Sequence, residues 1–361
     1  MADSGERSRI TKGRGATLAP SPRYLATTRE EFDDGWTELD ERPKLTTTIT
    51  SEWVKTIISR NKSPDLPFEQ SINPYRGCEH GCVYCYARPT HAYLDLSPGL
   101  DFESRLFAKM NAPEVLREEL AHAKYQCSPI ALGANTDAYQ PCERQLEITR
   151  KVLTVLSATG HPVTLVTKAA LIERDIDLLG ALAARTLVEV FVSVTTLDHA
   201  LARKMEPRAT APRRRLETIR RLTNAGIPVG VMIAPLIPGL NDDELETILE
   251  QAAACGARTA SYVMLRLPRE VSPLFQAWLE QHYPLRAQKV MNAIRNLRGG
   301  RDYESEFGTR MHGRGPFAEI IRARFARARQ HFKLNSQRTT LSCAHFMAPT
   351  PAASNLQLSL F

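Results

Sequence analysis

The stretch NPYRGCEHGCVYCYA, at positions 73–87, holds three of the chain's seven cysteines: Cys78, Cys82 and Cys85. Their spacing, Cys-x3-Cys-x2-Cys, lets three thiolates converge on one soft metal centre, and Gly81 lets the backbone bend between them. A structural zinc ion takes four protein ligands, and only His80, folding back between two cysteines, is at hand as a fourth. A four-iron cluster on three cysteines would instead leave one iron open to a ligand that is not protein. The spacing therefore leaves two hypotheses, a closed zinc site or a cluster with an open, catalytic iron.

The chain has 361 residues, 43% of them hydrophobic, which suits a globular protein of one large domain or two smaller ones. No apolar run is long enough to span a bilayer, and the polar start MADSGERSRITKGRG lacks the apolar core of a secretory signal. We therefore expect a cytoplasmic protein without a membrane partner. In that compartment thiols stay reduced, and clustered cysteines indicate metal or redox chemistry more often than disulfides.

Apolar stretches alternate with helical patterns from about position 71 onward. After a first strand just before Cys78, the predicted strands are 129–135, 161–168, 187–196, 227–239 and 257–268. The predicted helices are 143–160, 173–184, 212–224 and 241–255, the last with Asn241 as N-cap and Gly256 just beyond its end. The strands are apolar rather than alternating, which predicts a parallel sheet covered on both faces. Such an α/β series forms an open sheet or a barrel, and both bind ligands at the carboxyl ends of the strands.

We expect six segments along the chain. They are an extended or disordered arm (1–45), a lead-in (46–70), the strand–helix region (71–268), a mostly helical C-terminal extension (269–334), a linker (335–356) and a short tail (357–361). In the extension, Ala318, Ile321, Phe325, Ala328 and Phe332 form one apolar helical stripe.

The motif CEHGCVYC, with Tyr84 before the last cysteine, resembles the cluster motif of the radical S-adenosylmethionine (SAM) superfamily. The resemblance covers positions 71–268 and implies a partial (βα)6 barrel of the TIM type. It implies a [4Fe-4S] cluster on Cys78, Cys82 and Cys85, with SAM chelating the open iron. In this family, an electron from a donor splits SAM into methionine and a 5′-deoxyadenosyl radical, which abstracts hydrogen from a substrate.

NPYRGCEHGCVYCYARPTH together with GANTDAYQPCE is similar to the branch related to spore photoproduct lyase, enzymes often labelled DNA repair photolyases. That lyase reverses a thymine dimer without light and has a hydrogen-donating cysteine on its second strand. This chain departs from the pattern, because Ala134 stands at that place and Cys142 follows downstream. Cys142 is thus a candidate catalytic hydrogen donor, although packing at a helix start is the interpretation that its position favours.

Polar residues at the predicted strand ends are candidate SAM-binding residues: Asn135, Thr136, Asp137, Lys168, Ser193 and Thr195. The resemblance implies that the SAM amino group binds after the second strand, where Asp137 can accept from its ammonium. A turn or helix cap formed by 135–137 is an equally natural alternative. Lys168 can meet a carboxylate or phosphate, or be a solvated strand end. Glu206 is either a site carboxylate or the ion-pair partner of nearby arginines.

The net charge of +7 is concentrated in two stretches. Positions 201–221 hold eight Lys/Arg and two Glu, and positions 310–333 hold seven Lys/Arg and one Glu. A run of this kind is usually a solvated helix face, but two of them on a chain with a radical site favour contact with DNA.

The chain ends in Gln357, Leu358, Ser359, Leu360 and Phe361 after a linker of small and polar residues. This pentapeptide is similar to the motif that binds the bacterial sliding clamp, in which apolar side chains enter a pocket of the partner. The alternative is a tail that folds back onto the body. A docked tail would raise the local concentration of the protein at DNA.

These observations together predict a radical SAM enzyme of the lyase or DNA-repair type. Two alternatives stay open. One is a radical SAM enzyme that acts on RNA, protein or a small molecule. The other is a non-catalytic nucleic-acid-binding module that a metal stabilises.

Overall fold

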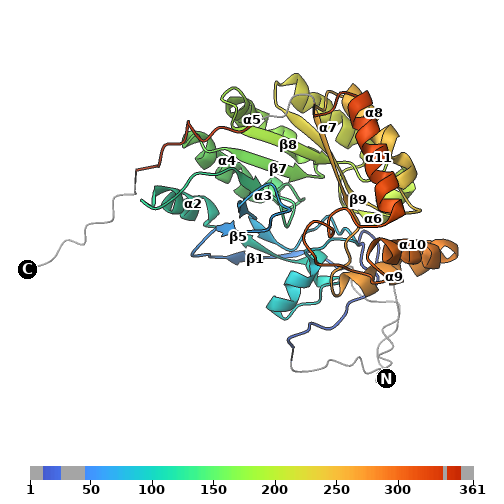
Figure 1. The fold of residues 1–361 in the computed structure, drawn as a ribbon. Helices are drawn as coiled ribbons and strands as arrows, with labels where there is room; N and C mark the ends of the chain where they lie inside the picture. Colours follow the sequence, from blue (N-terminus) through green and yellow to red (C-terminus); the bar gives the residue numbers. More distant parts are fainter. Residues whose placement is uncertain (1–10, 26–44, 336–339, 351–361) are drawn as a thin grey trace, which may run out of the picture.

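The computed structural model describes residues 11–25, 45–335 and 340–350 (Figure 1). Its centre is a seven-stranded sheet in the order β10-β9-β8-β7-β6-β3-β2, in which β2 (Ile58–Arg60) is the antiparallel edge strand. The parallel strands are β3 (Gln70–Ile72), β6 (Ile130–Leu132), β7 (Val163–Thr167), β8 (Val188–Ser193), β9 (Val229–Leu236) and β10 (Thr259–Met264). These neighbours follow one another in the chain, and β10 does not pair with the other edge in the described residues. The predicted partial barrel of six parallel strands is therefore confirmed.

Helices cover the outer face of the parallel strands, as the apolar strand sequences require (Figure 1). They are α2 (Ala112–Ala121), α4 (Ile148–Ala158), α5 (Ile176–Ala183), α7 (Pro212–Asn224) and α8 (Leu245–Ala254). Strand residues such as Val190 and helix residues such as Leu249 are fully buried in one core between the two layers. This core holds the strands in place, and their carboxyl ends present the loops described below.

Two of the helix predictions need correction. The predicted helix 143–160 is divided into α3 (Glu143–Leu146) and α4, because Glu147 adopts a left-handed backbone with φ 53°. Asn241 was expected to cap a helix, and it does precede the 3-10 helix Asp242–Glu244 that leads into α8 at Leu245, but its side chain makes no capping hydrogen bond. The Asn241 amide is buried and instead accepts from the Ile237 N–H (2.6 Å) and donates to the Thr195 carbonyl (2.7 Å). It thereby satisfies backbone groups in the loops after β8 and β9.

A second, three-stranded sheet was not predicted. It consists of β1 (Thr48–Glu52), β5 (Arg105–Lys109) and β4 (Tyr75–Arg76). These strands are short, and β1 is largely exposed, so no apolar pattern marks it in the sequence. The described part of the arm, residues 11–25, contains neither helix nor strand, yet Arg14 and Ala16 are buried against the body.

The C-terminal extension is mostly helical, as predicted, with α9 (Val271–His282), α10 (Pro284–Leu297) and α11 (Pro316–His331). Figure 1 shows α11 lying along α8. Four residues of the predicted stripe are buried: Ala318, Ile321, Phe325 and Ala328. The extension also covers the free edge of β10, where the Met264 N–H donates to the Met311 carbonyl (2.8 Å). In the described residues, no helix is long and apolar enough to cross a membrane.

The α11 stripe offers a matched test of this packing. Ile321 is fully buried, whereas its neighbour Ile320 is 54% exposed. We expect Ile321→Ala to lower the free energy of unfolding by about 2–5 kcal/mol, because it leaves a cavity against α8. Ile320→Ala should change it by less than about 0.5 kcal/mol. Urea unfolding followed by circular dichroism measures both variants, and equal effects would contradict the position of α11.

Candidate active site

The three-cysteine loop lies at the carboxyl ends of the parallel strands. Cys78 and Cys82 are buried, Cys85 is half-buried, and all three are free thiols. The loop begins with a tight turn at Gly77, whose φ is 75°. A Cβ there would lie 2.7 Å from the Leu106 side chain and 2.9 Å from the Phe102 carbonyl, so the turn accepts only glycine.

A buried arginine holds the inside of this loop. Arg88, in the 3-10 helix Arg88–Leu94, is completely buried and uses all five of its N–H donors. Two of them reach carbonyls within the loop, at Cys82 (2.9 Å) and Gly81 (3.3 Å). The others reach the carbonyls of Pro98 and Gly99 and the Glu103 carboxylate (2.5 Å). One side chain therefore fixes the backbone on both sides of Cys82, the second thiol.

The partner of Arg88 joins the N-terminal segment to the same loop. Glu103, in α1 (Asp101–Ser104), is fully buried and also accepts from the N–H groups of Gly15 (2.9 Å) and Ala16 (2.8 Å). Arg14 in turn donates to the Glu103 carbonyl (2.6 Å). Part of the predicted arm is thus a structural element of the cysteine loop.

A glutamine brackets the first thiol. The fully buried Gln140 accepts from the Glu79 N–H (2.9 Å) and donates to the Gly77 carbonyl (3.2 Å). These are the two residues on either side of Cys78. The Cys78 N–H itself donates to the Phe102 carbonyl (2.9 Å). The position of the Cys78 thiol is therefore determined by backbone contacts that do not need a bound ligand.

Two predicted site residues lie beside the thiols. Lys168, after β7, donates to the Ser193 hydroxyl at the end of β8 (3.0 Å), and its ammonium lies 5.9 Å from the centre of the Tyr84 ring. Burial, with the nearby Glu206 carboxylate, raises the pKa of Cys82 to about 12, and the Lys168 charge opposes that rise. The structure thus brings Lys168 and Ser193 together near the loop. Their role in SAM binding stays a prediction.

Glu206 is an ion-pair residue. It is buried, pairs with the buried guanidinium of Arg215, and accepts hydrogen bonds from the hydroxyls of Tyr84 and Thr195 (2.6 Å for Thr195). Burial alone would raise its pKa, but Arg215 and Lys168 outweigh burial and hold the pKa at about 2. Thr195 is therefore engaged with this carboxylate, and Tyr84 is held by it against the loop.

The Asp137 carboxylate connects the loops that follow β6 and β7. It accepts from the Lys168 N–H (2.7 Å), the Thr167 hydroxyl (2.7 Å) and the Tyr139 N–H (2.9 Å), and His80 Nδ1 lies 3.3 Å away. Burial raises its pKa, but His80 and these hydrogen bonds outweigh burial and lower the pKa to about 2. Four contacts occupy the acceptor positions of a carboxylate, which favours the turn-forming role over binding an ammonium.

The other two residues of the loop after β6 differ from each other. Asn73 accepts from the Asn135 N–H (2.8 Å) and shapes this loop. The buried Thr136 hydroxyl donates to the Tyr75 carbonyl (2.8 Å). In the described residues, the side-chain amide of Asn135 has no such partner. Asn135 therefore keeps its side-chain donors for a ligand, whereas the Thr136 hydroxyl has already donated its one proton.

Cys142 lies at the first turn of α3, buried in the main core. Burial, then the charges of Glu79 and Glu143, raise the pKa of its thiol. Its neighbour Glu143 accepts from the Thr149 N–H (3.0 Å) at the start of α4 and pairs with Arg174 (2.8 Å). This setting agrees with packing at a helix start, and the hydrogen-donor role of Cys142 remains an untested prediction.

The donor set can be compared with the two metal hypotheses. Among residues 11–25, 45–335 and 340–350, no three His, Cys, Asp or Glu side chains lie close enough together to hold a single metal ion. The imidazole of His80 is turned to Asp137. In an iron–sulfur cluster each thiolate binds its own iron, so the sulfurs lie further apart than around one zinc ion. Three free thiols without a fourth donor therefore fit a cluster better than a structural zinc site.

The sequence profile of the radical SAM superfamily matches residues 72–252, which are half of the chain and run from the last residue of β3 into α8. The chain belongs to the radical SAM superfamily. It is therefore a radical SAM enzyme, and the alternative hypothesis of a non-catalytic nucleic-acid-binding module is excluded. Membership implies SAM and a [4Fe-4S] cluster, and the three thiols of the loop are the residues that would hold the cluster.

Relatives of this radical SAM enzyme include an uncharacterized protein of Mycobacterium tuberculosis. It is 38% identical over 229 residues, which are 62% of this chain and 67% of the relative. An uncharacterized protein of Methanocaldococcus jannaschii is 27% identical over 221 residues, 61% of this chain and 79% of the relative. The fold is similar to that of spore photoproduct lyase complexed with dinucleoside spore photoproduct, with a TM-score of 0.57, 17% identity, and coverage of 84% of this chain and 85% of the lyase. At that identity the likeness shows a common fold.

Sequence reasoning missed the residues that position the loop. Glu103 and Gln140 carry no motif of their own, since their partners are backbone groups distant in sequence. Arg88 left a weak signal, because an arginine three residues after Cys85 stands in an otherwise small and aromatic stretch.

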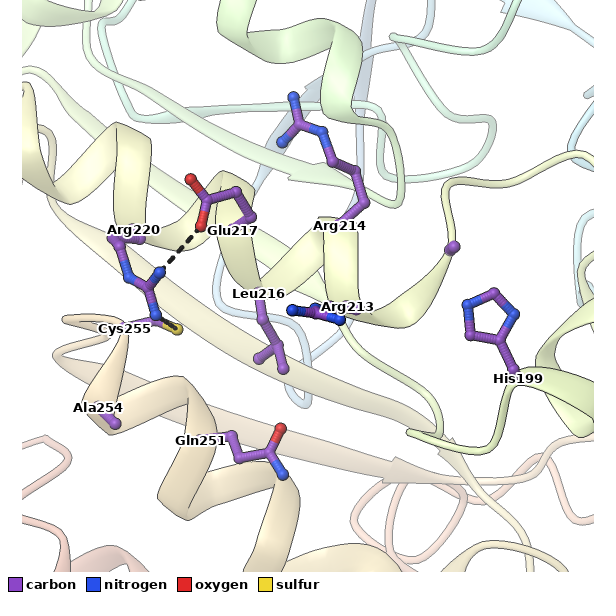
Figure 2. Close-up of a pocket in the computed structure, with 10 residues that line it drawn as sticks. His199, Arg213, Arg214, Leu216, Glu217, Arg220, Gln251, Ala254 and Cys255 are labelled. Carbon is purple, nitrogen blue, oxygen red and sulfur yellow. Dashed lines mark hydrogen bonds and ion pairs between the residues drawn. The ribbon is translucent and has the colours of Figure 1, made fainter.

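The basic stretch 201–221 is largely ion-paired. Arg214 pairs with Glu173 (2.5 Å), Arg208 with Glu79 (3.0 Å) and Arg220 with Glu217 (3.0 Å). A cavity of about 720 Å³ lies between α7 and α8. Figure 2 shows the side chains that line it, among them Arg213 and His199, which have no ion-pair partner in the described residues. This cavity lies between outer helices, so it is not part of the cysteine site.

The Arg88 contacts predict a coupling between stability and cluster loading. Arg88→Met should lower the free energy of unfolding by about 3–5 kcal/mol, because it leaves the buried Glu103 carboxylate unpaired. It should also reduce the iron and sulfide bound after reconstitution. Arg105→Met is the control, because that side chain is 55% exposed with only a 4.0 Å contact to Asp101, and its effect should stay below about 1 kcal/mol. Full iron loading with an unchanged urea midpoint in Arg88→Met would contradict this role.

Proposed function

We propose that this radical SAM enzyme cleaves SAM reductively at a [4Fe-4S] cluster on Cys78, Cys82 and Cys85 and acts on damaged DNA. The bound cluster and SAM supply a 5′-deoxyadenosyl radical for hydrogen abstraction. The observation that carries the proposal is the set of three free thiols at the strand ends, two buried and one half-buried, where His80 is committed to Asp137. A set of three donors leaves room for a small-molecule ligand.

The residues around the thiols have distinct tasks in this proposal. Lys168 offers a positive charge for a carboxylate, and its contact with Ser193 orients it. Asn135 offers an amide at the neighbouring strand end. Asp137 positions the loop between them, and Thr195 with Glu206 holds Tyr84. Val83 and Phe275 belong to a second apolar core under the loop, which keeps water from that side.

The proposal that DNA is the substrate is supported by Tyr86, Arg266 and Tyr303, which form the rim of the site. Tyr86 directly follows Cys85 and is 45% exposed. The guanidinium of Arg266, just beyond β10, lies 5.4 Å from the Tyr86 ring and 5.9 Å from the Tyr303 ring. An exposed ring and a half-buried ring with an arginine between them suit stacking on an unpaired base. Spore photoproduct lyase, which has the same fold, has been solved with a dinucleoside photoproduct.

The pentapeptide Gln357–Phe361 lies outside the described residues, and its role is part of the proposal. We infer that it binds the bacterial sliding clamp and keeps the enzyme near DNA during replication or repair. An electron donor is also required, because SAM cleavage consumes an electron.

Anaerobic SAM cleavage tests the chemistry. With a reconstituted cluster, SAM and a strong reductant, the chain should form 5′-deoxyadenosine, and UV-irradiated DNA should change the yield. Replacing Cys78, Cys82 or Cys85 by Ala should reduce the yield to background. Cys255→Ala is the matched control, since that thiol lies at the end of α8. If damaged DNA does not change the yield, the proposal that DNA is the substrate is wrong. If protein with a fully loaded cluster does not cleave SAM, the proposed reaction is wrong.

Removal of residues 357–361 tests the tether. We expect at least about a tenfold loss of affinity for a purified sliding clamp, because buried apolar anchors dominate binding of such peptides. Leu358→Ala and Phe361→Ala should each reproduce most of the loss, whereas Ser359→Ala should have little effect. Surface plasmon resonance gives the affinities, and equal binding by the shortened chain would contradict the tether.

A further inference from the structure

Two cysteines outside the active site lie side by side, although 216 residues separate them in the chain. The Cys343 thiol donates to the Cys127 carbonyl oxygen at a distance of 3.5 Å. Both residues are half-buried, and both are free thiols. A thiol that lies against the backbone of a second free cysteine is a starting geometry for a disulfide.

Backbone and ring contacts place this pair. Cys343 belongs to the C-terminal segment, residues 340–350, which Figure 1 shows running beside α4. The Ser342 N–H donates to the Thr186 carbonyl (3.2 Å), and the Met347 N–H donates to the Thr159 carbonyl (2.9 Å). The Phe346 ring packs between the rings of Tyr125 (5.5 Å) and His161 (5.3 Å). The segment is therefore docked on both sides of Cys343.

A glycine makes this docking possible. Gly160 has a φ of 62°, and a Cβ at this position would lie only 2.2 Å from the His345 carbonyl oxygen. Any side chain there would push the C-terminal segment away from the body. The close approach of Cys343 to Cys127 thus depends on a particular backbone position.

The location of the pair separates it from the cluster chemistry. Thr159 and Gly160 precede β7, Thr186 precedes β8, and Cys127 precedes β6. These are the amino ends of parallel strands, whereas Cys78, Cys82 and Cys85 lie at the carboxyl ends. Oxidation of the one group can therefore proceed without the other.

We propose that Cys127 and Cys343 are an oxidation site at which a peroxide forms a disulfide that fastens the C-terminal segment to the barrel. One S–S bond forms and two S–H bonds break. The thiols lose two electrons and two protons, and hydrogen peroxide is reduced to two molecules of water. The inference rests on the docking geometry alone and does not depend on the substrate of the enzyme.

The environment of Cys127 determines how the rate of disulfide formation depends on pH. Burial, followed by the hydrogen bond with Cys343, raises the pKa of Cys127 to about 12. The thiolate is the reactive form, so the disulfide should form slowly at neutral pH and faster as the pH rises.

Peptide mapping tests the site on the full-length, reconstituted chain. After treatment with hydrogen peroxide, free thiols are blocked with N-ethylmaleimide, and the protein is digested with trypsin and Asp-N without reduction. Asp-N cleaves before Asp137 and so separates Cys127 from Cys142. We expect peptide 125–136 linked to peptide 339–361, and no such species in Cys127→Ser or Cys343→Ser. Recovery of both peptides only as separate adducts would overturn the proposal.

Variants in the surface where the C-terminal segment docks test whether this docking is what allows the disulfide to form. Gly160→Ala should lower the yield of the linked peptide about tenfold, since it removes the high effective concentration of the two thiols. Phe346→Ala gives a second route to the same loss if Gly160→Ala fails to fold. Met347→Ala is the control, because its side chain is 66% exposed, and its yield should equal that of the unaltered chain. Unchanged yields in Gly160→Ala and Phe346→Ala would overturn the role of docking.

Discussion

The buried ion pair of Arg88 and Glu103 is the constraint on which the cysteine loop depends. Both side chains are fully buried, and together they bind the loop, the turn at Pro98 and Gly99, and the N-terminal segment at Gly15 and Ala16. A buried pair of this kind gives little net stability compared with an apolar core, but loss of one partner leaves an uncompensated charge. Its value here lies in geometry, because three thiols need fixed relative positions to hold the proposed cluster.

Two further buried arginines bind several backbone carbonyls in loops at other strand ends, as Arg88 does in the cysteine loop. Arg215 donates to the carbonyls of Ser193 (3.1 Å) and Thr210 (2.5 Å) and pairs with Glu206. Arg298 donates to the carbonyls of Leu265 (2.8 Å) and Arg310 (2.8 Å), and burial lowers its pKa to about 10. An open barrel has no continuous ring of strand pairs to rigidify its mouth. Planar guanidinium groups that bind several carbonyls fix the loops there instead.

The two ends of the barrel carry different tasks. The thiols, Lys168 and the aromatic rim lie at the carboxyl ends of the strands, where a parallel sheet presents its loops. The C-terminal segment docks at the amino ends, through Thr159 and Thr186. The proposed clamp-binding tail follows this segment, so the tether would start from the end opposite the thiols. That arrangement leaves the rim around Tyr86 and Arg266 free for a substrate.

The sequence by itself determined the fold class, the order of the six parallel strands and the family. These features are local, because apolar runs, caps and the spacing of Cys78, Cys82 and Cys85 are readable along the chain. It also identified Lys168 and Ser193 as strand-end residues. Only the tertiary structure decided which polar groups are already occupied. Asp137 and Thr195 looked available in the sequence, but Lys168, Thr167 and Glu206 engage them in the fold. The contact between Cys127 and Cys343 and the enclosure of Arg88 by Glu103 were likewise beyond sequence reasoning. Each joins segments distant in the chain, and hydrogen bonds to backbone groups leave no residue pattern to recognise.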